Sequence, residues 1–170
     1  MKAGLLALAV AATLAAPVAA EDWTGPYAGL GVGRGDVDGP GAQDGDGTTY
    51  GLHAGYDYDM GSVVLGAELE YNWADIELGG GGVVDTFSRL KLRAGYDFGP
   101  ALGYVVAGTS RADTSLGDET GAVYGLGVAY ALRDGITLSG EWLRDDFDTF
   151  GIPRSDLTSD SFNLRASFRF

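Results

Sequence analysis

The sequence predicts an all-β fold, an eight-stranded antiparallel up-and-down transmembrane β-barrel. Three observations lead to this fold class. Apolar and polar residues alternate with a period of two along most of the chain, which is typical of strands whose two faces meet different surroundings. The connections alternate between tight turns and long polar loops, as in a meander of hairpins. An even number of strands of about ten residues can also close on itself and leave no strand edge unpaired.

The first twenty residues have the features of a cleaved secretory signal peptide. Lys2 supplies a positive charge, residues 5–16 form an apolar run, and Pro17 ends it. Small residues follow, so cleavage is expected after Ala20. The apolar run is short for a transmembrane anchor. The remaining residues, 21–170, are expected to form one barrel domain.

The predicted strands follow one another along the chain. Four segments show unbroken alternation: residues 49–58, 63–73, 88–98 and 162–170. Four weaker segments complete the set: residues 26–34, 101–110, 122–132 and 136–144. Tight turns are expected at 59–62, 99–100 and 134–135, and long polar loops at 35–48, 74–86, 111–120 and 145–159. All four loops would then emerge at one end of the barrel and the three turns at the other.

Alternation alone does not decide which face points inward. A soluble ligand-binding barrel buries its apolar face, whereas a membrane barrel turns that face to lipid. The polar faces carry opposite charges, which would compensate one another inside a closed barrel because buried charges must be paired. The sequence therefore predicts a structural charge network in the lumen. Its expected members are His53, Glu68, Glu70, Arg89, Lys91, Arg93, Glu141 and Arg165.

Strand registers follow from the turns, with long loops leaving them loose. The expected opposite pairs are Tyr58 with Val63, His53 with Glu68, Glu68 with Lys91, Glu70 with Arg89, and Glu141 with Arg165. On the first strand, Gly29, Gly31 and Gly33 share one face, where they are expected to make room inside a narrow barrel.

Aromatic residues gather near the strand ends, as in the two interfacial girdles of a membrane barrel. Those near the tight turns are Tyr56, Tyr58, Tyr96, Phe98, Tyr104, Tyr130, Phe168 and Phe170. Those near the long loops are Tyr50, Tyr71, Trp73, Tyr124, Trp142 and Phe162. Small and aliphatic residues lie between the two groups, which favours lipid outside the barrel.

Two segments carry a resemblance to a known family. Residues 23–33, WTGPYAGLGVG, resemble the first strand of the small outer-membrane β-barrels of Gram-negative bacteria, the OmpA-like, OmpX-like and opacity-type proteins. Residues 163–170, NLRASFRF, look like their C-terminal assembly signal. The resemblance implies that the barrel assembly machinery reads Leu164, Ala166, Phe168 and Phe170. Because the chain stops at its eighth strand, a cell-wall tethering role is not expected.

Composition narrows the possible functions. The formal charge of −13 argues against nucleic-acid binding, and the absence of cysteine excludes disulfides and thiolate sites. Together with the barrel pattern, the resemblance implies a monomer with a structural or surface-interaction role, no catalysis and no cofactor, which contacts outer-membrane lipid and lipopolysaccharide. The alternatives are a small porin-like channel, a lipid A-modifying enzyme and a soluble periplasmic ligand-binding barrel.

Two features invite other chemistry. His53 is the sole histidine, but Ala54 and Gly55 follow it, unlike the His-x-Ser arrangement of lipid A deacylases, so a structural role is favoured. Residues 36–47 are acidic and glycine-rich and suggest calcium, yet Pro40 interrupts them and no glutamate closes the set. A solvated surface loop is expected there and at 145–148, with weak cation binding left open.

Overall fold

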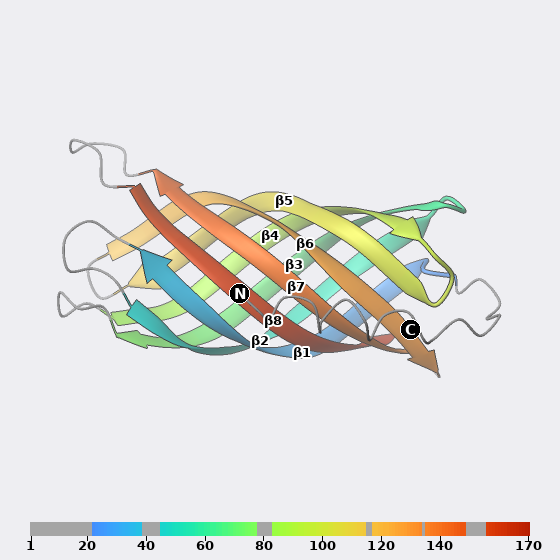
Figure 1. Cartoon of the computed structure of the whole chain (residues 1–170), viewed down its shortest axis with the longest axis horizontal. Helices are drawn as coiled ribbons and strands as arrows, with labels where there is room; N and C mark the ends of the chain where they lie inside the picture. The colour runs from blue at the N-terminus through green and yellow to red at the C-terminus, as the bar shows by residue number, and fades with distance from the viewer. Residues whose placement is uncertain (1–21, 39–44, 78–82, 115–116, 134, 149–155) are drawn as a thin grey trace, which may run out of the picture.

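The computed structural model describes residues 22–38, 45–77, 83–114, 117–133, 135–148 and 156–170. Each strand pairs antiparallel with its neighbours in sequence, and the last strand pairs with the first, so the sheet closes into a barrel (Figure 1). The strands are β1 (Gly25–Asp38), β2 (Gly45–Asp59), β3 (Val63–Glu77), β4 (Val83–Asp97), β5 (Ala101–Thr114), β6 (Gly117–Arg133), β7 (Ile136–Asp148) and β8 (Asp156–Arg169). The predicted fold class is confirmed. Among the described residues, no helix is long and apolar enough to cross a membrane.

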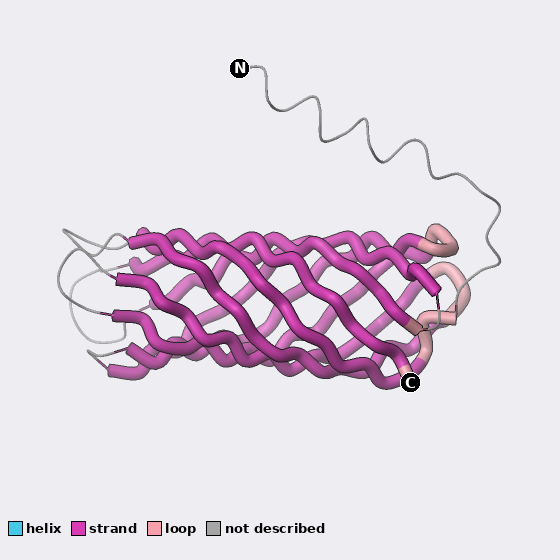
Figure 2. The backbone as a smooth tube through the Cα atoms, turned by 90° about the horizontal axis from the view of Figure 1, so that it is seen from below, coloured by secondary structure: helices cyan, strands magenta, loops and turns pink. Residues whose placement is uncertain are grey.

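The two ends of the barrel differ, as Figure 2 shows. We call the end with the short connections the turn end and the opposite end the loop end. Each turn-end connection contains a glycine at positive φ: Gly61 at 102°, Gly99 at 88° and Gly135 at 76°. Residues with a β-carbon rarely adopt this conformation, so glycine permits the tight reversal. All three predicted turns lie at this end.

The strands extend further toward the loop end than the sequence predicts. The expected loop at 111–120 is wrong, because β5 continues to Thr114 and β6 begins at Gly117. The expected acidic loop at 145–148 is also wrong, because these residues belong to β7. In both places polar side chains continue the strand, since pairing with the neighbouring strand satisfies the backbone hydrogen bonds that a loop leaves to water.

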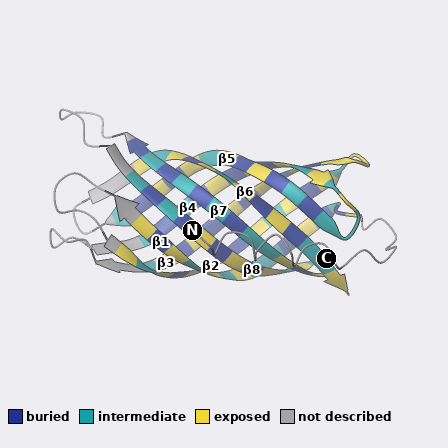
Figure 3. Ribbon diagram, in the orientation of Figure 1, coloured by how far each residue is buried: buried dark blue, intermediate teal, exposed yellow. Residues whose placement is uncertain are grey.

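Side chains alternate between the two faces of the wall, and Figure 3 shows the resulting chequered pattern of buried and exposed residues. Large apolar residues are exposed on the outer face; Leu69 is 63% exposed and Leu92 66%. Charged residues fill the inner face; Lys91 is 0% exposed and Glu141 1%. This distribution is the reverse of a soluble protein and matches a barrel surrounded by lipid.

Outward-facing aromatic rings lie near both ends of the apolar band. Toward the loop end, the rings of Tyr50 and Trp73 stack at 5.9 Å. Toward the turn end, Tyr96 and Phe98 lie 4.9 Å apart. Rings at these depths suit the interfaces of a bilayer.

One predicted member of the outer girdle points the other way. Tyr104 is 4% exposed and belongs to an apolar cluster inside the barrel. The reason is that β5 is apolar on both faces, so alternation could not orient it: Val105 is exposed while its neighbours Tyr104 and Val106 are buried. The cluster contains Trp23, Val64, Leu102, Tyr104, Val106, Val123, Ala129 and Leu143.

Candidate functional site

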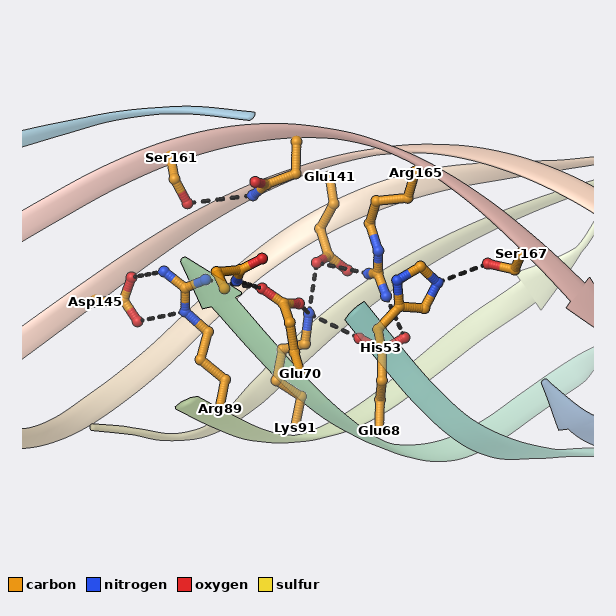
Figure 4. A network of polar contacts seen from close by, with 12 residues as sticks. His53, Glu68, Glu70, Arg89, Lys91, Glu141, Asp145, Ser161, Arg165 and Ser167 are labelled. Carbon is orange, nitrogen blue, oxygen red and sulfur yellow. Dashed lines mark hydrogen bonds and ion pairs between the residues drawn. The ribbon is translucent and has the colours of Figure 1, made fainter. Parts of the chain in front are cut away.

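Lys91 lies at the centre of the charged interior, enclosed by three glutamates (Figure 4). Its Nζ is 2.5 Å from Glu70 Oε2, 2.6 Å from Glu141 Oε1 and 2.9 Å from Glu68 Oε1. The glutamates come from β3 and β7, so the ammonium joins opposite walls of the barrel. We call this arrangement the lysine cage.

Two arginines extend the network on either side of the lysine cage. Arg165 Nη2 lies 2.5 Å from Glu68 Oε2, and its Nη1 lies 2.9 Å from Glu141 Oε1. On the loop-end side, Arg89 donates two parallel hydrogen bonds to Asp145, of 2.9 and 2.6 Å, and a third of 2.8 Å to Glu70. Such bidentate pairs are the strong form of the ion pair and fix geometry as well as charge.

The turn end has its own cluster, centred on Asp57. Arg93 and Arg169 both donate to Asp57 Oδ2 at 2.8 Å. Arg169 also donates to the Trp23 carbonyl oxygen, and its guanidinium lies 5.5 Å from the Trp23 ring. Trp23 is 1% exposed, and its indole N–H donates to Asp97 at 3.3 Å. The segment before β1 is thereby held across the mouth of the barrel.

A carboxyl group lies just outside the strands at this end. The backbone N–H of Thr24 donates to Asp22 Oδ1 at 2.9 Å, and this hydrogen bond lowers the pKa of Asp22.

Acids and bases are equal in number among the described side chains that form ion pairs inside the barrel. The acids are Asp57, Glu68, Glu70, Glu141 and Asp145, and the bases are Arg89, Lys91, Arg93, Arg165 and Arg169. Each has an ion-pair partner. Desolvating a charge costs several kcal/mol, and breaking a buried pair by removing one member typically costs about 3–5 kcal/mol. Removing one of these charges should therefore leave its partner buried with less compensation.

All eight residues expected in the lumen network lie on the inner face, but two registers differ from the prediction. Across β2 and β3, His53 lies opposite Glu70 and Tyr58 opposite Leu65, two residues from the expected pairs, because the turn is centred one residue later, between Gly61 and Ser62. His53 Nε2 instead forms a 2.7 Å hydrogen bond with Ser167 Oγ on β8. The β3–β4 register is as predicted, with Glu70 opposite Arg89.

The last hairpin also differs from the prediction. Arg165 lies opposite Ser139, and Glu141 lies opposite Asn163. The two charged groups nevertheless meet at 2.9 Å, because long side chains reach diagonal neighbours.

The sequence analysis missed three members of the network, Asp57, Asp145 and Arg169. Asp57 lies on the same face of its strand as His53, and Arg169 on the same face as Arg165. Following every second residue toward the turn end would therefore have found both. Asp145 was assigned to a loop, although it follows Glu141 and Leu143 on the same face.

Glycines on β1 give the network its space. A β-carbon on Gly29 would lie 2.6 Å from His53 Nε2, and one on Gly33 would lie 2.1 Å from Asn163 Oδ1. These distances are shorter than any ordinary contact, so side chains from β2 and β8 occupy the volume that larger residues on β1 would need.

Metal binding has one candidate among the described residues. Carboxylate oxygens of Glu68, Glu70 and Glu141 lie within 4.8 Å of one another. The ammonium of Lys91 already lies among these oxygens and supplies the positive charge. Of the acidic stretch expected as a surface loop, residues 39–44 lie outside the described residues. The loop is wrong for the rest, because residues 36–38 belong to β1 and residues 45–47 to β2, where Asp46 is exposed and pairs with Arg34.

The four residues expected to form the assembly signal are all exposed, three on β8 and Phe170 directly after it. Leu164 is 58% exposed, Phe168 47% and Phe170 75%, and Ala166 is exposed between them. The backbone N–H of Phe170 donates to the carbonyl of Pro26 at 3.0 Å, so pairing with the first strand reaches the last residue.

Known structures share this architecture. Neisserial surface protein A superposes with a TM-score of 0.62 at 16% identity, covering 86% of this chain and 98% of that one. Ail, the attachment invasion locus protein of Yersinia pestis, superposes with a TM-score of 0.58 at 15% identity. The match covers 86% of this chain and 99% of Ail. At these identities the similarity concerns the fold.

Sequence comparison gives the family. A 22 kDa outer membrane protein of Rhizobium leguminosarum bv. viciae is 29% identical over 159 residues, 85% of this chain and 72% of the relative. A 25 kDa outer-membrane immunogenic protein of Brucella melitensis biotype 1 is 27% identical over 168 residues, which cover 89% of this chain and 79% of the relative. The family model of the outer membrane protein beta-barrel domain matches residues 4–170. The chain therefore belongs to the outer-membrane β-barrel protein family.

Proposed function

We propose that this protein is a monomeric, sealed outer-membrane barrel with a structural or surface-interaction role and no catalysis. The observation that carries the proposal is the filled lumen. The lysine cage spans the middle of the barrel, and Arg89 with Asp145 occupies the section toward the loop end. Eight strands leave an interior just wide enough for side chains.

Both ends of the lumen support the same proposal. At the turn end, buried Trp23 lies under the guanidinium of Arg169. Toward the loop end, the buried rings of Phe87 and Phe147 lie on the lumen face of the barrel. A hydrated ion would have to displace aromatic rings and break several buried ion pairs, which opposes the alternative of a porin-like channel.

The position of His53 supports a role without lipid chemistry. Its side chain is 4% exposed and lies on the lumen face, hydrogen-bonded to Ser167. A lipid substrate approaches from the outer face of the wall, so an enzyme acting on lipid A would need its histidine there. The outward-facing apolar surface likewise argues against a soluble ligand-binding barrel.

The location of the protein and its surroundings follow from the same features. We expect cleavage after Ala20, recognition of β8 by the barrel assembly machinery, and both ends of the mature chain in the periplasm. Two outward-facing arginines near the loop end, Arg34 and Arg144, would then lie where they can bind lipopolysaccharide phosphates. The Arg144 guanidinium lies 5.7 Å from the ring of Trp142, a residue expected in the aromatic girdle near the long loops.

Planar-bilayer recording tests the sealed lumen. The folded full-length mature protein should give no steady channels, whereas the double variant Lys91→Ala/Arg165→Ala should conduct if it remains folded. Leu92→Ala, which changes an outward residue beside Lys91, is the matched control and should stay silent. Reproducible channels from the wild-type protein would refute the proposal and favour a diffusion pore.

A further inference from the structure

Two small cavities lie one behind the other at the turn end. The inner cavity, about 10 Å³, lies inside the barrel below the Glu68–Arg165 pair, and Ser139 and Ser167 contribute to its wall. The outer cavity, about 20 Å³, lies at the barrel mouth beside Trp23. Volumes of this size are close to what one water molecule needs.

The two cavities share part of their walls. Thr137 and Arg169 line both, so these two side chains form the partition between the inner cavity and the barrel mouth. Thr137 comes from β7, and its neighbour two residues along on the same face is Ser139. The path from the mouth to the inner cavity therefore runs past Thr137.

Three residues that line the inner cavity carry polar atoms without a hydrogen-bond partner in the protein. The Nε–H groups of Arg93 and Arg165 have none, although the two side chains are only 7% and 3% exposed. Glu68 Oε1 accepts no hydrogen bond and has only its ion-pair contact with Lys91. A buried donor without a partner is unfavourable, and such groups beside a polar cavity are usually satisfied by ordered water.

The wall chemistry selects the ligand. The Nε–H groups of Arg93 and Arg165 need an acceptor, Glu68 Oε1 can accept a further hydrogen bond, and the hydroxyls of Ser139 and Ser167 can donate or accept. An anion in this space would face the Glu68 carboxylate, and a cation would face Arg93 and Arg165. Water both donates and accepts, and it has the size of the cavity.

Beyond the inner cavity lies the lysine cage. Glu68 and Arg165 line the cavity and are themselves bonded to Lys91 and Glu141. The inner cavity thus adjoins the cavity at the barrel mouth in one direction, across Thr137 and Arg169, and the lysine cage in the other. We propose that the barrel contains a one-sided water site that exchanges with the periplasmic solvent past Thr137 and Arg169 and ends at the lysine cage. The one-sided part of this inference rests on the proposed sealed lumen.

Cysteine accessibility tests the inference, because the natural chain has no cysteine. Ser139→Cys places a thiol in the inner cavity, with Ser167→Cys as a second reporter. Ser161→Cys places one on the lumen face toward the loop end, where Ser161 is 5% exposed. Each full-length variant, folded in lipid nanodiscs and checked for heat-modifiable migration, is exposed to Ag⁺, a probe of about the size of water. The unblocked thiol is then counted by alkylation after denaturation.

Ag⁺ should block Ser139→Cys while the barrel stays folded. Adding Thr137→Leu, which fills the partition, should slow this blocking roughly tenfold, the effect of about 1.4 kcal/mol on a barrier. Thr137→Val, which keeps the volume, should not. The rate at Ser161→Cys should be the same with Thr137 or Leu at position 137.

The possible failures are distinguishable. If neither Ser139→Cys nor Ser167→Cys reacts, the inner cavity exchanges no water and the inference is wrong. If Ser139→Cys reacts equally fast with Thr137→Leu, the path past Thr137 is wrong. If Thr137→Leu also slows the reaction of Ser161→Cys, the lumen is continuous, and the sealed barrel itself is overturned.

Discussion

Lys91 Nζ lies 2.6 Å from Glu141 Oε1, although these residues are 50 positions apart and belong to strands that are not neighbours in the barrel. The contact crosses the lumen from β4 to β7. Backbone hydrogen bonds join each strand only to its neighbours, so an ion pair of this kind ties opposite walls together. It also places charge where a pore would run.

Lys91→Met should strongly destabilise the barrel. It leaves Glu68, Glu70 and Glu141 close together without the ammonium, and removing one partner of a buried ion pair typically costs about 3–5 kcal/mol. Arg165 and Arg89 still compensate part of the charge, so we expect the lower end of that range. The free energy of unfolding, from urea titration in lipid vesicles, measures the loss. Leu92→Met, on the outer face of the same strand, should cost less than about 1.5 kcal/mol. Equal losses for the two variants would argue against the lysine cage.

The bidentate pair of Arg89 and Asp145 should be energetically coupled. In a double-mutant cycle with Arg89→Gln and Asp145→Asn, we expect an interaction energy of about 0.5–3 kcal/mol, the range for residues in contact. The exposed pair of Arg34 and Asp46 provides the matched cycle and should give about 1 kcal/mol or less, since solvent screens it. Additive single-variant effects at Arg89 and Asp145 would contradict the buried pairing.

Gly29→Ala should destabilise the barrel more than Gly140→Ala. The added β-carbon at Gly29 would lie 2.2 Å from the Ala166 carbonyl oxygen and 2.6 Å from His53 Nε2, so the wall or the ring must shift. Overpacking of this kind typically costs about 1–3 kcal/mol. At Gly140 the nearest atom is 3.7 Å away, an ordinary contact. The midpoint of urea unfolding compares the two variants, and a Gly29→Ala protein as stable as Gly140→Ala would remove the argument for close packing at β1.

Arg169→Met should loosen Trp23 without unfolding the barrel, because Asp57 keeps its second partner Arg93. Trp23 loses both the hydrogen bond to its carbonyl and the guanidinium beside its ring. In a background carrying Trp73→Phe and Trp142→Phe, Trp23 is the single tryptophan, since the chain has three. Acrylamide should then quench its fluorescence more strongly after Arg169→Met.

Arg34→Met is the control for that measurement, since Arg34 is an exposed arginine on β1 toward the loop end. It should leave the quenching of Trp23 unchanged. Similar quenching in the wild-type protein and in Arg169→Met would mean that Arg169 does not hold the N-terminal segment.

Much of the architecture could be predicted because parity along a strand is a local property. Alternation placed Glu68 and Glu70 on one face and Leu69 on the other, and the opposite charges on the next segment, Arg89 and Lys91, indicated that these faces meet. The register between them was correct. That the polar faces turn inward followed from the need to pair buried charges.

The errors have physical causes as well. Where both faces of a segment are apolar, as around Tyr104, the alternation does not show which face points into the lumen. A turn centred one residue later along the chain moves every opposite pair by two residues, which places His53 opposite Glu70 and not Glu68. Contacts across the lumen, such as Lys91 with Glu141, depend on the tilt and stagger of the whole closed sheet, and no local pattern encodes these.

Membrane fractionation combined with heat-modifiability tests most directly whether the apolar faces point outward from a closed barrel. The mature protein is extracted from the outer membrane and run on SDS gels with and without boiling. We predict that it fractionates with the outer membrane and migrates faster unboiled, since a closed barrel resists the detergent. A protein that is soluble without detergent and migrates identically in both lanes would contradict the outward apolar face and the membrane barrel with it.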